Sequence, residues 1–278
     1  MFKSILLPTD GSEYSRTAVE YGLVLAKHYK ASVRALHVID LKKLAGPLIH
    51  DISICLGVTP PPNFQETLQE TSRQLGQAIL EETGKLAADA GVECTTILRT
   101  GIVSDVLCKE AHTVDLVVLG QRGEFSEWGS RIFGSTFEAT IRQINKPVFV
   151  APRARTRIER VLAAYDGSRT ANSVLKIAAE ACAQEDLTMK VVVVDSDDSY
   201  GRELFEEVQS FLEPYKLKFE IERVGGAPGE AIVEAARKYD ADVLAMGAYG
   251  HSRLRELIMG STTEYVLRYA ECPVLLYR

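Results

Sequence analysis

The sequence predicts an α/β protein built from two tandem doubly wound domains, each with a five-stranded parallel sheet. The chain has 278 residues, enough for two domains of about 140 residues each. Apolar strand-like runs alternate with helical patterns along its whole length, as in parallel α/β sheets. The same short motifs also occur twice and in the same order, which indicates internal duplication.

The repeat is clearest at the beginning of each half. The first half opens with an apolar run that ends in the sequence Asp-Gly-Ser at 10–12, and the second with one that ends in the same three residues at 166–168. A helical pattern follows each of them, and the serine is a typical N-cap residue. The corresponding segments are 10–12 and 166–168, 114–120 and 241–247, 134–136 and 260–262, and 146–150 and 272–276. Their common order favours one duplicated unit.

Each half is expected to alternate strands and helices. In the first half, strands are predicted near 3–8, 32–39, 92–98, 115–120 and 147–151, and helices near 13–29, 64–90, 102–112 and 135–144. In the second half, strands are predicted near 159–165, 188–194, 217–224, 242–247 and 273–277, and helices near 169–184, 199–214, 229–239 and 261–270. The strands are rich in Val, Ile and Leu with little alternation, which is typical of strands covered by helices on both faces.

The two halves meet in segment 151–157, whose proline and three arginines predict a solvated linker. We therefore expect one domain over residues 1–153 and a second over 154–278. The main asymmetry is segment 41–62, which has no counterpart in the second half. This segment is rich in apolar residues and ends in three prolines, so its composition is not that of a freely disordered chain.

The bulk composition narrows the class of protein. The formal net charge of −6 argues against a general nucleic-acid binder, because no excess of basic residues exists to neutralise phosphates. No stretch approaches the length of a membrane span, and the first residues enter a strand pattern without room for a signal peptide. The five cysteines are scattered without a Cys-x-x-Cys pair, which indicates a reducing cytoplasm.

The motifs of each half are expected to converge on one crevice. In a doubly wound sheet, ligands bind beyond the carboxyl ends of the strands, where the strand order reverses. For the order 3-2-1-4-5, that point lies between the first and fourth strands. Asp10 and Asp166 end first strands, and Gly120 and Gly247 end fourth strands.

The glycine segment of the second half has the chemistry of a phosphate cradle. Gly247 and Gly250 are followed by nine residues and then by Gly260, Ser261 and Thr262. Glycines let the backbone approach anionic oxygens. The free N–H groups at the start of the following helix attract phosphate, and the two hydroxyls can add hydrogen bonds.

These motifs resemble the universal stress protein family, and the resemblance covers nearly the whole chain twice. It rests on the Asp-Gly-Ser opening, the Gly-x2-Gly-x9-Gly-Ser/Thr segment and the closing Pro-Val strand. The resemblance implies an adenine-nucleotide alpha-hydrolase-like fold that binds ATP, with Mg²⁺ as an accompanying ion. It also implies that the two halves mimic a family dimer that pairs through its last strands.

The resemblance implies one nucleotide site in each half. The candidates in the first half are Pro8, Thr9, Asp10, Val38, Gly120, Arg122, Gly123, Gly134, Ser135 and Thr136. The candidates in the second half are Tyr165, Asp166, Val194, Gly247, Gly250, His251, Gly260, Ser261 and Thr262. In this scheme the aspartate and the second-strand valine hold the adenosine, and the glycine segment wraps the phosphates.

Each half departs from the family pattern. The first has ten residues between Gly123 and Gly134, and they include Glu124 and Glu127. Two carboxylates would repel a triphosphate unless Mg²⁺ or nearby arginines such as Arg122 intervene. In the second half, Ala164-Tyr165 replaces Pro8-Thr9, and the Tyr165 ring could stack on adenine or crowd it.

Structural alternatives stand beside several of these roles. Asp10 and Asp166 could simply be turn or cap residues, since Asp-Gly is a common turn pair. His37 lies in an expected buried strand and is better explained as a core histidine than as a ligand. His251 could contact phosphate, whereas Trp128 is better explained as a packing or lid residue.

The favoured function is a regulatory protein of the stress response that binds ATP, and no catalytic residue is assigned. Efficient phosphoryl transfer needs a metal-holding carboxylate and a cationic clamp, and the chain has no Gly-x4-Gly-Lys-Ser/Thr and no His-x-Gly-His motif. A slow ATPase and an interaction module with decayed sites are the alternatives. Segment 41–62 is expected either to cover the first site or, as we favour, to pack against a second chain in a homodimer.

Overall fold

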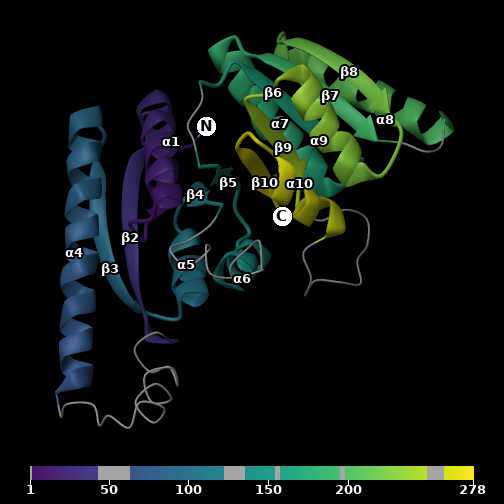
Figure 1. The fold of residues 1–278 in the computed structure, drawn as a ribbon. Helices are drawn as coiled ribbons and strands as arrows, with labels where there is room; N and C mark the ends of the chain where they lie inside the picture. The colour runs from purple at the N-terminus through teal and green to yellow at the C-terminus, as the bar shows by residue number, and fades with distance from the viewer. Residues whose placement is uncertain (1, 43–62, 122–134, 154–156, 195–197, 249–259) are drawn as a thin grey trace.

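A single ten-stranded sheet forms the frame of the protein (Figure 1). The structure is a computed structural model that describes residues 2–42, 63–121, 135–153, 157–194, 198–248 and 260–278. The strand order is β3-β2-β1-β4-β5-β10-β9-β6-β7-β8. Each half therefore contributes five adjacent strands, and each has the order 3-2-1-4-5 when its strands are numbered separately.

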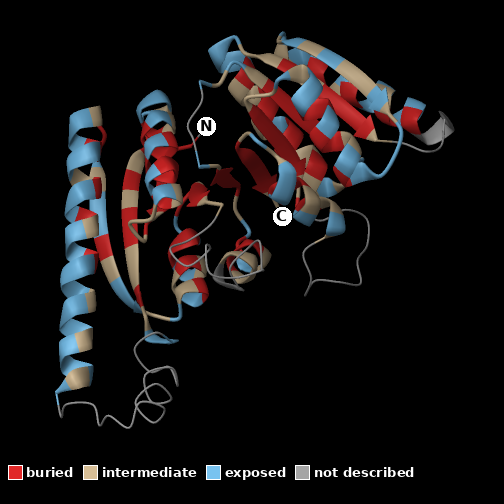
Figure 2. Cartoon of the chain, in the orientation of Figure 1, coloured by how far each residue is buried: buried red, intermediate tan, exposed pale blue. Residues whose placement is uncertain are grey.

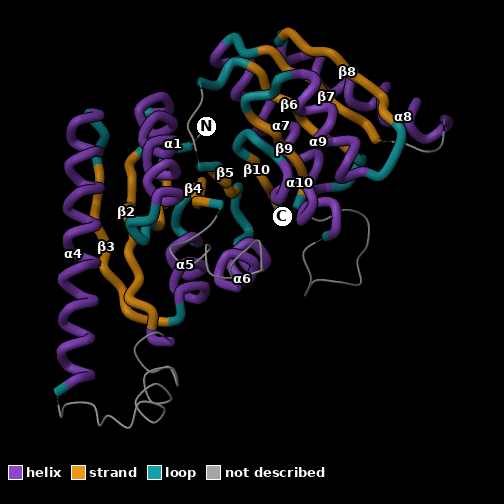
Figure 3. Tube along the Cα trace, viewed as in Figure 1, coloured by secondary structure: helices purple, strands orange, loops and turns teal. Residues whose placement is uncertain are grey.

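The described elements of the first half follow the predicted β/α alternation. They are β1 Ser4–Pro8, α1 Glu13–Tyr29, β2 Ser32–Asp40, α4 Phe64–Ala90, β3 Cys94–Gly101, α5 Val103–Ala111, β4 Leu116–Gly120, α6 Ser135–Gln143 and β5 Val148–Ala151. The predicted elements are confirmed to within a few residues. Figure 3 shows that α4 extends beyond the strands it covers. Apart from Leu41 and Lys42, segment 41–62 lies outside the described residues, so its predicted role stays a prediction.

The second half repeats this plan. Its elements are β6 Arg160–Tyr165, α7 Arg169–Glu185, β7 Thr188–Val194, α8 Asp198–Leu212, β8 Lys218–Val224, α9 Pro228–Tyr239, β9 Val243–Gly247, α10 Ser261–Tyr269 and β10 Val274–Tyr277. The helix predicted over 199–214 ends at Leu212 and is followed by a 3₁₀ turn over Glu213–Tyr215. Proline at 214 explains the change, because it lacks the N–H that a continuing helix needs.

Equivalent helices begin and end with the same local devices. Ser12 caps α1 by accepting a hydrogen bond from the Ser15 N–H at 3.3 Å. Ser168 caps α7 by accepting one from the Ala171 N–H at 3.1 Å. Both helices end at a residue in the left-handed conformation, Lys30 and Asp186, each with φ 51°. The serine caps satisfy first-turn N–H groups, and the left-handed residues stop the helices after about five turns.

Helices cover both faces of the sheet, so most strand residues are buried (Figure 2). In β1, Ile5 and Leu7 point into the apolar cluster under α1, α4, α7 and α8, whereas Leu6 points into the cluster under α5, α6, α9 and α10. Successive strand residues thus enter different layers, as the period of two requires. The central strands therefore read as continuous apolar runs, whereas the edge strands β3 and β8 are largely half-buried or exposed and carry polar residues.

The two halves are joined through their last strands. β5 and β10 pair antiparallel, with Val150 opposite Val274 and Val148 opposite Leu276, while the other neighbouring strands pair in parallel. The prediction that these strands lie together about a local two-fold axis is confirmed. Side chains also cross the join, because His28 Nε2 on α1 lies 2.6 Å from Glu185 Oε1 on α7. No described helix is both long and apolar enough to cross a membrane.

Candidate functional site

The strand order reverses once in each half, at the positions where the crevices are predicted. β1 lies between β2 and β4, and β6 lies between β7 and β9. Helix α1 after β1 and helix α5 before β4 cover opposite faces of the sheet, an arrangement in which doubly wound sheets bind ligands at the carboxyl edge. The residues predicted to hold a nucleotide follow these strand ends, which makes the two edges the candidate sites.

Asp10 and Asp166 form tight turns at the ends of β1 and β6. Asp10 Oδ1 accepts hydrogen bonds from the Ser12 N–H at 3.0 Å and from the Ser12 hydroxyl at 2.6 Å. Asp166 Oδ1 accepts one from the Ser168 N–H at 3.0 Å. The glycine between each pair has positive φ, 80° at Gly11 and 75° at Gly167. The turn role that the Asp-Gly sequence suggested is thus present in both halves, and Asp10 is half-buried whereas Asp166 is exposed.

Thr9 directs its side chain toward α1. It is buried, its hydroxyl lies 3.2 Å from the Ser15 hydroxyl, and its carbonyl oxygen lies 2.8 Å from His37 Nδ1. The interpretation of His37 as a core residue is consistent with this contact. Pro8 is the half-buried last residue of β1. The first strand therefore presents mainly its backbone and Asp10 to the crevice.

The Tyr165 side chain lies in the core of the second half. Its side chain is 3% exposed and belongs to the core under α7 and α8. Its hydroxyl donates to Asn172 Oδ1 at 2.9 Å, and burial, followed by interaction with Glu207, raises the pKa of the phenol. The ring cannot stack on adenine without leaving the core. Residue patterns alone missed this because both faces of a buried strand are apolar.

Gly120 and Gly247 have a packing role. A Cβ on Gly120 would lie 2.8 Å from the backbone carbonyl of Tyr14 in α1. A Cβ on Gly247 would lie 2.5 Å from Thr170 Oγ1 and 2.9 Å from the Ala171 nitrogen in α7. Side chains at these positions would collide with helix backbones, so glycine lets β4 and β9 approach the neighbouring helices.

Gly260 contrasts with these two glycines. It is the N-cap residue of α10 with φ −60° and ψ 141°, a conformation open to any residue. A Cβ there would lie 3.8 Å from Thr263 Oγ1 and 3.9 Å from the Ala248 oxygen, both ordinary contact distances. Neither backbone strain nor described neighbours therefore require glycine at this position.

The first turn of α10 is held beside the end of β9. The Thr263 hydroxyl donates to the Ala248 carbonyl oxygen at 2.7 Å and is buried. Ser261 is exposed and Thr262 half-buried. Sequence reasoning missed Thr263, although a third hydroxyl residue after Gly260 was a visible signal. The structure thus brings Gly247 and the 260–262 segment to neighbouring positions.

The remaining candidates are placed less completely. Val38 and Val194 are half-buried at equivalent positions of β2 and β7, against the cluster under α5 and α9. Ser135 and Thr136 begin α6. Arg122, Gly123, Gly134, Gly250 and His251 lie outside the described residues, as do Glu124, Glu127 and Trp128. Among the residues that the structure describes, no group of three or more His, Cys, Asp or Glu side chains could hold a metal ion.

Comparisons with known proteins agree on one family. A model of the universal stress protein family matches residues 1–152 and again 157–278. Universal stress protein Slr1230 from Synechocystis sp. is 32% identical over 286 residues, covering 99% of this chain and 100% of that protein. Universal stress protein MJ0531 from Methanocaldococcus jannaschii is 27% identical over 157 residues, covering 56% of this chain and 85% of that protein.

A solved structure shares the fold over the full length. The crystal structure of a universal stress protein from Archaeoglobus fulgidus DSM 4304 superposes with a TM-score of 0.79 and 23% identity. The superposition covers 99% of this chain and 98% of that one. The mostly parallel α/β sheet of both halves is therefore an architecture found in this group of proteins.

Proposed function

The chain belongs to the universal stress protein family, and we propose that it is a regulatory protein that binds an adenine nucleotide, ATP, at its two crevices. The second crevice carries the proposal, because its cradle glycine, Gly260, is among the described residues, whereas Gly134 of the first half lies outside them. The first crevice follows from the repeat, since Asp10, Val38 and Gly120 occupy positions equivalent to Asp166, Val194 and Gly247.

The observation that carries the proposal is the unexplained glycine at position 260. Gly120 and Gly247 are required by protein packing, but around Gly260 the described part of the protein leaves room for a side chain. A ligand that approaches the backbone is a physical reason for glycine at such a place. Gly260 precedes α10, whose first-turn N–H groups and positive dipole end favour an anion. A phosphate chain fits both features.

Each of the other residues of the second site has a proposed role in holding the nucleotide. Ser261 and Thr262 would donate their hydroxyls and backbone N–H groups to the phosphates, and Thr263 would hold the helix start in place through its bond to Ala248. Asp166 is exposed at the end of β6 and would accept hydrogen bonds from the nucleoside. Val194 would supply an apolar contact to the base. Mg²⁺, where present, would be held mainly by the phosphates.

A binding role is favoured over efficient catalysis. Phosphoryl transfer depends on groups placed at the phosphates. One carboxylate oxygen of Asp10 and one of Asp166 instead accept hydrogen bonds within the turn that follows the first strand of each half. We expect any ATP hydrolysis to stay far below the enzyme median of about 10 per second. A rate near that value, lost on replacement of one carboxylate, would support the ATPase alternative. Failure to retain or bind any nucleotide would support an interaction module with decayed sites.

Isothermal titration with ATP tests the second site directly. Gly260→Val should remove one binding event, because the branched side chain would occupy the space proposed for phosphate, while the fold stays intact. Gly84→Ala is the matched control, since a Cβ there meets only Thr96 Cγ2 at 3.6 Å on the distant helix α4. Unchanged stoichiometry and affinity in Gly260→Val would refute the assignment. Mass spectrometry of the small molecules released from denatured protein would identify the natural nucleotide.

We also propose that the protein acts in the cytoplasm as a homodimer, and that segment 41–62 makes the dimer contact. The support is its apolar composition. Deleting residues 43–60 should give a monomer by light scattering, with first-site affinity nearly constant. An unchanged mass with weaker nucleotide binding would instead indicate that the segment covers the first site.

A further inference from the structure

A hollow on the surface of the second half is lined by none of the residues assigned above. It has a volume of about 430 Å³ and lies between the loop after β8, helix α9 and helix α10. Its walls include Gly226, Glu230, Glu234, Arg237, Tyr265 and Tyr269. The volume falls within the range of ligand pockets, and we call this hollow the α9–α10 groove.

One wall of the α9–α10 groove is aromatic. Tyr265 and Tyr269 lie one turn apart on α10, with ring centroids 4.4 Å apart and planes inclined by 42°. Tyr269 is 43% exposed. Gly229 lets Tyr265 lie against α9, because a Cβ at Gly229 would come within 2.8 Å of the Tyr265 side chain. The wall is thus fixed by helix packing and still open to solvent.

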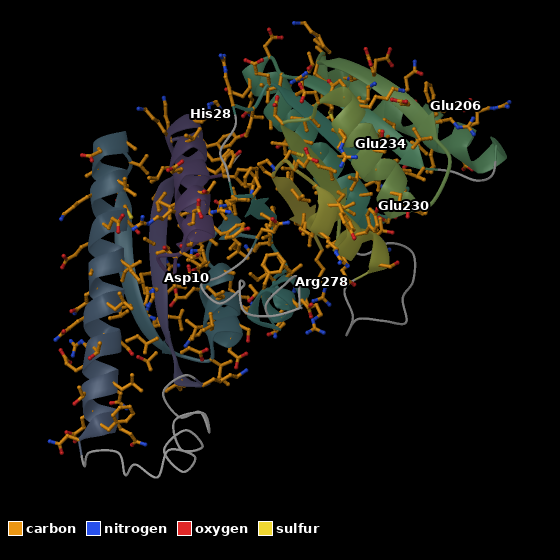
Figure 4. All side chains as sticks on the ribbon, viewed as in Figure 1. Asp10, His28, Glu206, Glu230, Glu234 and Arg278 are labelled. Atoms are coloured by element: carbon orange, nitrogen blue, oxygen red, sulfur yellow. The ribbon has the colours of Figure 1, made fainter. Side chains whose placement is uncertain are left out.

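The opposite wall carries an excess of negative charge. Arg237 contacts Glu234 at 3.2 Å and Glu271 at 3.3 Å, so its charge is met by two carboxylates. Glu230 is exposed and has no ion pair among the residues that the structure describes. Figure 4 shows Glu230 and Glu234 on the same helix, α9. A ligand in the groove would therefore meet an unneutralised carboxylate beside the aromatic wall.

The aromatic wall already attracts one cation of the protein itself. The guanidinium carbon of Arg268 lies 5.1 Å from the centre of the Tyr269 ring. This is within the distance at which a positive charge is stabilised by the face of an aromatic ring. The chemistry of both walls therefore favours a cation carried on an apolar stem, which can lie along the rings while its charge reaches Glu230.

We propose that the α9–α10 groove binds a lysine- or arginine-bearing segment of a partner protein. A long basic side chain matches the groove in polarity and charge. The corresponding residues of the first half, five and nine positions after its cradle glycine, are Ala139 and Gln143. The aromatic wall is therefore specific to the second half, and one chain would bind one such segment.

The test measures binding of a short fluorescein-labelled peptide of alternating glycine and arginine to the full chain. Fluorescence anisotropy reports the binding, and no nucleotide is present. Tyr269→Leu keeps an apolar side chain but removes the ring, and Glu230→Gln removes the charge. Each should weaken binding about three- to ten-fold. Because Tyr269 and Glu230 are exposed, neither change should unfold the protein, which circular dichroism would check.

Glu206→Gln is the charge-matched control, because Glu206 is exposed on α8, away from the groove (Figure 4). It should leave the affinity unchanged. An equal loss in Glu206→Gln would show that only net charge matters and would overturn the proposal. So would binding of a glycine–glutamine peptide with the same affinity, or no binding of the arginine peptide to the unaltered chain. Displacement by free spermidine at concentrations below the peptide's own dissociation constant would reassign the groove to a small amine.

Discussion

The two halves place a basic residue at the same position of the sheet and neutralise it in different ways. Arg34 on β2 lies opposite Leu6, and Lys190 on β7 lies opposite Leu162. The Arg34 guanidinium contacts Glu110 of helix α5 at 2.5 Å. The Lys190 ammonium instead contacts Glu222 and Glu220 of the neighbouring strand β8 at 3.1 and 3.4 Å. Duplication kept the cation, while its partner changed from a helix to a strand.

The difference shows which features of the repeat are free to diverge. In the first half Glu110 is buried and also contacts Arg99 at 3.0 Å. In the second half burial opposes the charge of Lys190, but the Glu222 and Glu220 carboxylates raise its pKa overall, and its ammonium lies 5.0 Å from the Tyr239 ring centre. Both solutions give a half-buried cation a carboxylate partner. The backbone plan therefore tolerates exchange of polar partners as long as each charge keeps one.

A second comparison is between Gly247, which protein packing requires, and Gly260, which we attribute to the close approach of a ligand. Gly247→Val should lower the free energy of unfolding by about 2–4 kcal/mol, because the new side chain collides with Thr170 and Ala171. Gly260→Val should change it by less than about 0.5 kcal/mol, since no described atom opposes a Cβ there. Urea unfolding followed by circular dichroism measures both. Similar losses in the two variants would give Gly260 a structural role and remove the main support for the phosphate cradle.

The two charge clusters should differ in strength. Glu110→Gln should cost about 1–3 kcal/mol, because Glu110 is buried and its loss leaves Arg34 and Arg99 without their shared carboxylate. Glu222→Gln should cost less than about 1 kcal/mol, because its side chain is 31% exposed and Glu220 still faces Lys190. Urea unfolding at low and high salt separates the two, since the more exposed pair is screened more strongly. An equal cost would mean that burial does not decide the strength of these contacts.

The fold could be predicted largely from the sequence, because the signals that define it are local. Serine caps, helical periodicity and apolar runs each depend on a few neighbouring residues, and they placed the helices and strands to within a few positions. The order of the strands and the pairing of β5 with β10 followed from the repeat and the family resemblance. Because the sequence is duplicated, each local pattern occurs twice, and the second occurrence supports the assignment of the first.

The details of the site depend on contacts distant in sequence. The packing role of Gly247 is visible only once α7 lies against β9, and the burial of Tyr165 only once α8 covers that face. The groove beside Tyr269 likewise needs the packing of α9 on α10. Such contacts leave little trace in a single sequence, because glycine, tyrosine and glutamate each suit several environments.

The last comparison concerns two aspartates at the amino ends of the strands, opposite the carboxyl edge that carries the candidate sites. Asp115 Oδ2 accepts hydrogen bonds from the N–H groups of Lys3 and Ser4 at 2.9 and 3.1 Å and from the Ser4 hydroxyl at 3.1 Å. Asp242 Oδ2 accepts from the N–H groups of Glu159 and Arg160 at 2.9 and 2.8 Å. Each carboxylate ties the first strand of its half to the start of the fourth.

Asp115 should contribute to the loss of stability in acid. Burial raises its pKa, but the hydrogen bonds from Lys3 and Ser4 and the charge of Lys146 outweigh that effect, and the net pKa is lowered. A carboxyl whose pKa is lower in the folded than in the unfolded chain stabilises the fold above the unfolded value, and this stabilisation is lost as the pH falls through the folded value. Asp115→Asn should therefore cost about 1–2 kcal/mol at neutral pH and flatten the decline in stability below about pH 4.

Urea unfolding between neutral pH and about pH 3 tests this expectation. Asp242→Asn is the matched variant in the second half and should lose a similar amount at neutral pH, because it too accepts two backbone hydrogen bonds. A decline in acid that is just as steep in Asp115→Asn as in the unaltered chain would show that other carboxylates control it. The hydrogen bonds at Asp115 would then hold the strands in place without making their stability depend on pH.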